Sequence, residues 1–150
     1  MHATYLSPFF TADREKLIES FRDFFKDWDN DIVLLGTGLS GTLALGAIAG
    51  IYPNIPIGIV RKEGDGSHSS CFIEAPNNYY NKWAFVDDLI CSGDTFSKVE
   101  QAVKDNSFVF ASGAELIMCV FYNGTMGKLG VDSYVTKTEN SYELSLYNSL

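Results

Sequence analysis

One stretch, residues 82–95, constrains the fold more than any other part of the chain. It reads KWAFVDDLICSGDT, so the short apolar run 83–86 is followed directly by two carboxylates, Asp87 and Asp88. A run of this length and composition predicts a buried strand. Because side chains alternate across a strand, we expect that the two acids do not both enter the core. Two ionised groups at a strand end would need a partner, such as a metal ion or a polyol.

Beyond the acids, a turn of small and hydroxylated residues leads into a predicted helix at 95–103. The turn consists of Cys91, Ser92, Gly93, Asp94 and Thr95. Small residues let backbone N–H groups approach an anion closely, and the N-terminus of a helix favours phosphate. The alternative is an ordinary acidic turn in which Asp94 or Thr95 only caps the helix.

This order of strand, paired acids and Ser/Gly/Thr turn resembles the 5-phosphoribosyl 1-diphosphate (PRPP) motif of the type I phosphoribosyltransferases. The resemblance implies that Asp87 and Asp88 hold the ribose 2- and 3-hydroxyls and influence a Mg²⁺ ion carried by the diphosphate. It also implies that the turn from Cys91 to Thr95 surrounds the 5-phosphate. The implied fold is α/β: a doubly wound, mainly parallel sheet flanked by helices, with a small C-terminal hairpin or hood.

A second glycine-rich turn follows an earlier predicted strand at 31–35. Its glycines, Gly36, Gly38 and Gly41, match the GxGxxG pattern that binds dinucleotide phosphates between a strand and a helix. Glu63, further along, could then bind a ribose. A turn that serves only to pack a helix closely against a strand is an equally open interpretation.

Under the resemblance to the phosphoribosyltransferases, this second turn is the pyrophosphate loop. Its N–H groups, offered to the leaving diphosphate, would be those of Thr37, Gly38, Leu39 and Ser40. Both interpretations assign phosphate binding to the turn. A small NAD-binding domain therefore stays open as an alternative, although 150 residues leave little room for a separate substrate domain.

A Gly- and Ser-rich segment, 61–70, follows the predicted strand 56–60. It starts with the basic pair Arg61 and Lys62 and contains His68. The segment resembles the flexible catalytic loop of the family, and its VRKE start is most similar to the orotate phosphoribosyltransferases. The resemblance implies that Arg61 and Lys62 neutralise charge on the pyrophosphate, with His68 near the closed site. Taken alone, His68 is better explained as a solvated loop histidine.

The rest of the chain alternates predicted helices and strands, which is typical of an α/β fold. Apolar residues at three- and four-residue steps predict an amphipathic helix at 13–28, and an Ala- and Leu-rich run predicts a packed helix at 42–49. A nearly continuous apolar run, 113–122, suits the interior of a parallel sheet. Two short strands, 131–136 and 142–147, are expected to pair as a hairpin.

Charge and composition narrow the class of protein. Eleven basic and nineteen acidic residues give a net charge of −8, which opposes binding to nucleic acid or to an anionic membrane surface. Three cysteines without CxxC spacing indicate neither a zinc site nor a disulfide framework. We therefore expect a cytoplasmic protein with a single domain, 1–150, and without a targeting or membrane-spanning segment.

The resemblance to the type I phosphoribosyltransferases implies a Mg²⁺-dependent enzyme that joins PRPP to a nucleobase, orotate or purine, with release of pyrophosphate. Family members are commonly dimers, so a homodimer is an expectation of the resemblance. The alternative is a regulator of the same fold that binds PRPP or a nucleotide without catalysis. It is motivated by Asp94 in the phosphate turn, by the short hood, and by the absence of a further Lys from the 61–70 loop.

Overall fold

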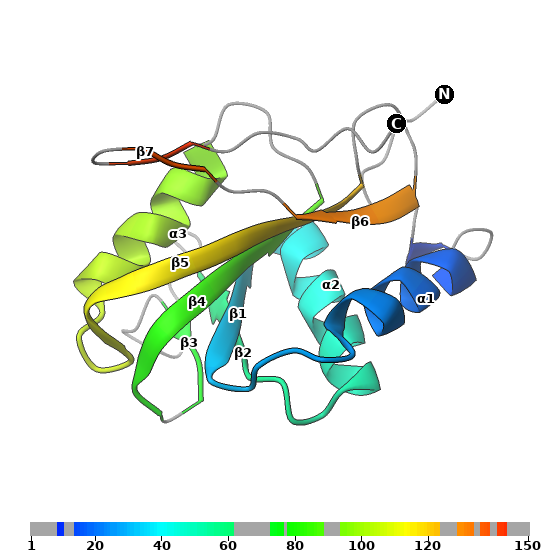
Figure 1. The fold of residues 1–150 in the computed structure, drawn as a ribbon, viewed down its shortest axis with the longest axis horizontal. Coiled ribbons are helices and arrows are strands. Elements are labelled where there is room, and N and C mark those ends of the chain that lie inside the picture. The colour runs from blue at the N-terminus through cyan, green and yellow to red at the C-terminus, as the bar shows by residue number, and fades with distance from the viewer. Residues whose placement is uncertain are drawn as a thin grey trace.

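The computed structural model describes residues 9–10, 14–61, 73–76, 78–88, 94–123, 129–133, 136–138 and 141–143. Helices and strands alternate through the first five strands except between β2 and β4, where the short strand β3 intervenes (Figure 1). In chain order the elements are α1 (Arg14–Phe25), β1 (Ile32–Thr37), α2 (Gly38–Ile51), β2 (Ile57–Val60), β3 (Ile73–Glu74), β4 (Tyr80–Asp87), α3 (Asp94–Asp105), β5 (Phe110–Asn123), β6 (Leu129–Ser133), β7 (Thr136–Thr138) and β8 (Ser141–Glu143).

The main sheet has six strands in the order β3-β2-β1-β4-β5-β6. Strands β2, β1, β4 and β5 run parallel, whereas β3 and β6 lie antiparallel at the two edges. From β1 the chain passes through α2 to β2 on one side, and from β4 it passes through α3 to β5 on the other. The order of strands therefore reverses between β1 and β4, and the predicted doubly wound, mainly parallel sheet is confirmed.

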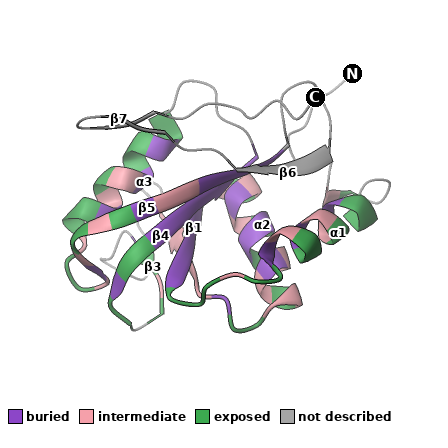
Figure 2. Ribbon diagram, viewed as in Figure 1, coloured by how far each residue is buried: buried purple, intermediate pink, exposed green. Residues whose placement is uncertain are grey.

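Helices cover both faces of the sheet: α1 and α2 pack on one face and α3 on the other (Figure 1). Alternate residues of each central strand belong to different cores. In β4, Ala84 and Val86 join the core under α1 and α2, while Trp83 and Phe85 join the core under α3. Because both faces are covered, β1 and residues 83–87 of β4 are buried at nearly every position, as Figure 2 shows for these strands.

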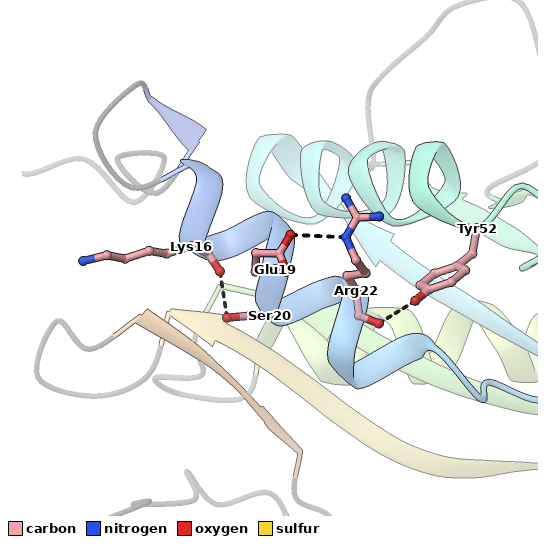
Figure 3. A network of polar contacts seen from close by, with 5 residues as sticks. All are labelled: Lys16, Glu19, Ser20, Arg22 and Tyr52. Carbon is pink, nitrogen blue, oxygen red and sulfur yellow. Dashed lines mark hydrogen bonds and ion pairs between the residues drawn. The ribbon is translucent and has the colours of Figure 1, made fainter.

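Helix α1 is amphipathic and helix α2 is not. Leu17, Phe21 and Phe25 recur every four residues along α1 and are buried, which places them on one face of that helix. The two helices are joined by a hydrogen bond from the Tyr52 hydroxyl, just after α2, to the carbonyl of Arg22 (Figure 3). In the part of the chain that the structure describes, no helix is long and apolar enough to cross a membrane.

The short strand β3 pairs antiparallel with β2. The two paired strands form a bracket, in the sense that they hold together the two ends of the segment between them. Val60 pairs with Ile73 and Ile59 with Glu74. The Arg61 Nε lies 3.4 Å from the Glu74 carboxylate, an ion pair across the same bracket. The two ends of the intervening segment are therefore held side by side.

The C-terminal part differs from the hairpin expected between 131–136 and 142–147. Residues of β6 instead add to the main sheet, where they pair antiparallel with β5. A separate hairpin does form, between the shorter strands β7 and β8. The physical reason is that β5 would otherwise present a long edge with unpaired N–H and C=O groups, which β6 covers.

Candidate functional site

The candidate site lies where the strand order reverses, at the carboxyl ends of β1 and β4. These two strands are paired in parallel, with Leu35 opposite Phe85, so that their last residues, Thr37 and Asp87, end at the same edge of the sheet. In open α/β sheets ligands bind at this edge, beside the reversal point. Both sequence motifs are therefore brought to one place.

The glycine-rich motif that starts at Gly36 is more compact than the expected turn. Strand β1 ends at Thr37 and helix α2 begins at Gly38, so no loop residue separates them, and the prediction that this helix starts at residue 42 is wrong. Gly38 has a φ of 68°, which favours glycine. A Cβ atom on Gly36 would lie 3.1 Å from the Val86 carbonyl oxygen and 3.3 Å from the Gly41 Cα. The close approach of α2 to the sheet thus explains Gly36 and Gly41, and the positive φ explains Gly38.

The N-terminus of α2 is left open toward an anion. Thr37, its N-cap residue, makes no side-chain capping bond, because the Thr37 hydroxyl donates instead to the Val60 carbonyl at 2.6 Å. No acidic residue lies in the first turn of the helix. The first N–H groups of a helix have no partner within the helix and carry the positive end of its dipole. The backbone of Gly38, Leu39 and Ser40 can therefore donate to a bound phosphate.

The motif at the end of β4 places its two acids almost entirely inside the protein. Asp87 and Asp88 are each 8% exposed, so the expectation that they do not both enter the core is wrong. The reason is that β4 ends at Asp87, and beyond the strand end side chains no longer alternate between faces. The backbone N–H of Asp88 donates to the Asp87 carboxylate at 2.9 Å, which orients that carboxylate.

A hydrogen bond links the two motifs directly. The Ser40 hydroxyl in α2 donates to Asp87 Oδ1 at 3.1 Å. Burial and, to a smaller extent, the adjacent Asp88 carboxyl raise the pKa of Asp87 from 3.8 to about 7, although the hydrogen bonds from the Asp88 N–H and Ser40 act in the opposite direction. Near neutral pH the Asp87 carboxyl is therefore divided between its protonated and ionised forms.

The two carboxylates fit a Mg²⁺ ion that arrives with its ligand. Mg²⁺ prefers oxygen donors, and in phosphate-handling sites it is usually held by one or two carboxylates together with the phosphates of the substrate. Within the described ranges no group of three or more His, Cys, Asp or Glu residues is placed to hold a metal. The pair Asp87 and Asp88 therefore suits a cation that is shared with a diphosphate better than a permanently bound one.

Three further predicted site residues lie in described parts of the chain. Arg61 directly follows β2. The last residue of that strand, Val60, pairs with Thr37, so the backbone of Arg61 lies at the same edge of the sheet. Asp94 and Thr95 are exposed in the first turn of α3. The remaining predicted positions lie outside the described residues: Lys62, Glu63, His68, Cys91, Ser92 and Gly93.

Sequence reasoning missed one residue that touches the site. Tyr122, near the end of β5, donates its hydroxyl to the Ser40 carbonyl at 2.8 Å. The signal was present, because a tyrosine ends the apolar run 116–122, whose other members are Leu, Ile, Met, Cys, Val and Phe and have no strong hydrogen-bonding side chain. A polar tip at the carboxyl end of a buried strand indicates a partner at that edge.

Comparison with solved structures identifies the fold. Orotate phosphoribosyltransferase from Francisella tularensis has a TM-score of 0.50 with 20% identity, and the match covers 68% of this chain and 50% of that one. Orotate phosphoribosyltransferase from Mycobacterium tuberculosis, in complex with Fe(III) dicitrate, has a TM-score of 0.52 with 21% identity, and the match covers 71% of this chain and 58% of that one. Adenine phosphoribosyltransferase from Rhodothermus marinus has a TM-score of 0.51 with 19% identity, and the match covers 72% of this chain and 65% of that one.

The described α/β architecture is thus the type I phosphoribosyltransferase fold, as the PRPP-like motif predicts. The matched region spans between half and about two thirds of the length of these three structures. No protein-family model matches the chain, and no curated protein is significantly similar to it in sequence.

Proposed function

We propose that this protein is a Mg²⁺-dependent phosphoribosyltransferase that transfers the 5-phosphoribosyl group of PRPP to a nucleobase, orotate or purine. In this reaction the bond from C1 of the ribose to the pyrophosphate oxygen breaks and a bond from C1 to a ring nitrogen of the base forms. The pyrophosphate leaves with the bonding electron pair, and the base gives up a proton. The observation that carries the proposal is the Ser40 to Asp87 hydrogen bond, which joins an anion-binding helix terminus to a buried pair of acids.

Each group at this edge has a role in the proposed reaction. Asp87 and Asp88 accept hydrogen bonds from the ribose hydroxyls, and their burial makes these bonds stronger than they would be in water. The first N–H groups of α2 stabilise the negative charge that develops on the pyrophosphate. Mg²⁺, when bound beside the two acids, would supply further neutralisation of that charge.

Basic side chains and the turn that precedes α3 complete the proposed site. Arg61 and Lys62 would neutralise the departing pyrophosphate, with His68 close to the reacting groups. The turn from Cys91 to Thr95 would receive the 5-phosphate ahead of α3. Arg61 forms an ion pair with Glu74, so its contact with pyrophosphate would compete with that pair.

Turnover with a panel of bases tests the proposal. PRPP and Mg²⁺ are incubated with orotate, adenine, guanine, hypoxanthine or uracil, and released pyrophosphate is measured. Asp87→Asn and Asp88→Asn should each lower turnover by about 10²-fold or more, because both remove a charge that faces the transition state. Asp23→Asn, which changes an exposed acid of α1, should leave turnover unchanged.

The same experiment separates the competing functions. Undiminished turnover in Asp87→Asn or Asp88→Asn would refute the assigned roles. Binding of PRPP by calorimetry without product on any base would favour a PRPP-binding regulator, which the exposed Asp94 and the Arg61–Glu74 ion pair make the second candidate. Thermal stabilisation by NAD but not by PRPP would favour a dinucleotide-binding domain.

A further inference from the structure

Tyr122 connects a rigid aromatic cluster to the candidate site. Its side chain is fully buried in the core under α1 and α2. Phe21 of α1 contacts the Tyr122 ring edge-on, with 5.8 Å between ring centroids, and Phe9 does so at 5.4 Å. Such edge-to-face contacts fix the orientation of a ring, so the position of the Tyr122 hydroxyl is determined by its surroundings.

The hydroxyl of Tyr122 starts a chain of hydrogen bonds that crosses three elements. Tyr122 in β5 donates to the Ser40 carbonyl at 2.8 Å, and Ser40 in α2 donates through its own hydroxyl to Asp87 in β4 at 3.1 Å. Ser40 is thus held at both its backbone and its side chain. A carbonyl oxygen has two lone pairs, so the bond from Tyr122 is compatible with the bond that the helix makes to the same atom.

The chemistry of Tyr122 suits a permanent donor. Burial raises the pKa of the Tyr122 hydroxyl far above its ordinary value, and the charges of Asp88 and Asp87 raise it further. The hydroxyl therefore keeps its proton at any pH at which the protein works. Tyr80 offers a contrast on the same sheet, because its buried hydroxyl has no hydrogen-bond partner among the described residues.

We propose that Tyr122 is a positioning residue that fixes the first turn of α2 and sets the Ser40 hydroxyl against Asp87. It would touch neither the ribose nor the pyrophosphate and would act through Ser40. Loss of its hydroxyl should let the α2 terminus move, so that the N–H groups meeting a pyrophosphate are less well placed. This inference rests on the proposed function, because it names the pyrophosphate as the ligand of that turn.

A pair of matched variants tests the proposal. Tyr122→Phe and Tyr80→Phe each remove one buried hydroxyl and keep the ring. Calorimetry with Mg²⁺ then measures the affinity of two probes, inorganic pyrophosphate for the α2 turn and ribose 5-phosphate for the acids and the turn before α3. For Tyr122→Phe we expect about tenfold weaker binding of pyrophosphate, roughly the worth of one hydrogen bond, and less than about twofold for ribose 5-phosphate. Tyr80→Phe should bind both probes like the unmodified protein.

Hydrogen exchange in the ligand-free protein provides a second readout that does not depend on function. In a helix the amide of residue 44 donates to the carbonyl of Ser40, so exchange at 43–45 reports on this turn. Exchange there should be several-fold faster in Tyr122→Phe than in Tyr80→Phe. Equal exchange in the two variants would overturn the positioning role.

The binding results distinguish the two proposals. If the unmodified protein binds both probes and Tyr122→Phe binds pyrophosphate equally well, the role of Tyr122 is refuted and the proposed function stands. An equal loss for both probes would indicate a general loosening and would also refute it. If the unmodified protein binds neither probe, the proposed function fails, and the exchange experiment alone decides whether Tyr122 fixes the turn.

Discussion

Buried polar groups are hydrogen-bonded differently at the carboxyl ends and at the amino ends of the parallel strands. At the carboxyl ends of β1, β4 and β5, Asp87 and Tyr122 are buried and linked through Ser40. At the amino end of β4, Tyr80 is equally buried, yet its hydroxyl has no partner among the described residues. Phe108, just before β5 at that amino end, is 93% exposed.

This difference shows where the fold maintains polar interactions in its interior. A buried polar group that lacks a partner costs stability, and a buried carboxyl costs more. The carboxyl edge carries two such acids and surrounds Asp87 with donors, which is the arrangement expected of a binding site. At the amino edge the buried Tyr80 hydroxyl has no partner among the described residues, so its removal should cost no stability.

The largest effect should come from the close contact between α2 and the sheet. Gly36→Val should destabilise the protein by about 3 kcal/mol, because a side chain there would press on the backbone of Val86 and Gly41. A Cβ atom on Gly46, on the exposed face of α2, would meet nothing within 4 Å, so Gly46→Val should change stability by less than about 0.5 kcal/mol. Urea unfolding measures both variants. Equal effects would mean that the carboxyl edge is no more tightly built than the exposed face of α2.

The next effect concerns the buried charge of Asp87 and depends on pH. The folded-state pKa of Asp87 is about 7 against 3.8 as its ordinary value, so the stability from the protonated form is complete below 3.8 and is lost as the pH rises through 7. Asp87→Asn cannot ionise and escapes this loss. Its stability relative to the unmodified protein should therefore rise by about 2 kcal/mol between about pH 5 and about pH 8.

Urea unfolding at several pH values checks this prediction, with Asp23→Asn as the control. Asp23 is exposed in α1, so its replacement should give a difference that does not vary over the same range. A constant difference for Asp87→Asn would mean that the Asp87 carboxyl is ionised in the folded protein throughout. The burial of an uncharged carboxyl would then no longer distinguish the carboxyl ends of the strands from the amino ends.

The smallest effect is expected at the amino edge. Tyr80→Phe removes a buried hydroxyl that has no described partner and should stabilise the protein by up to about 1 kcal/mol. Tyr122→Phe should instead destabilise it by about 1 kcal/mol, since the Ser40 carbonyl loses a donor. Thermal unfolding of the two variants measures the difference. Losses of equal size would remove the distinction between the two edges.

The elements with a clear period were predictable from the sequence. The apolar spacing predicted α1 and α3, and the short apolar runs predicted β1, β2 and β4, each within a few residues of its observed bounds. The position of the acids also followed from sequence, since a strand that ends in two carboxylates places them at the edge of a sheet. These features depend on neighbours in the chain, which a sequence displays directly.

The features that were missed depend on tertiary contacts. Strand β5 begins at Phe110 rather than at 113, because Gly113 adopts a φ of 74° and the pairing with β4 shifts there without ending the strand. Nothing local in the sequence distinguishes this irregularity from a turn. The hydrogen bond from Tyr122 to Ser40 joins residues 82 positions apart, so spacing alone could not reveal it.

The bracket formed by β2 and β3 has a consequence for how such a protein can diversify. Because Val60 and Ile73 are paired, the stretch between them leaves and re-enters the sheet at adjacent points. Doubling the length of a stretch whose two ends are held together in this way costs only about 0.6 kcal/mol. Its length and composition can therefore change while the strands that carry the acids keep their register.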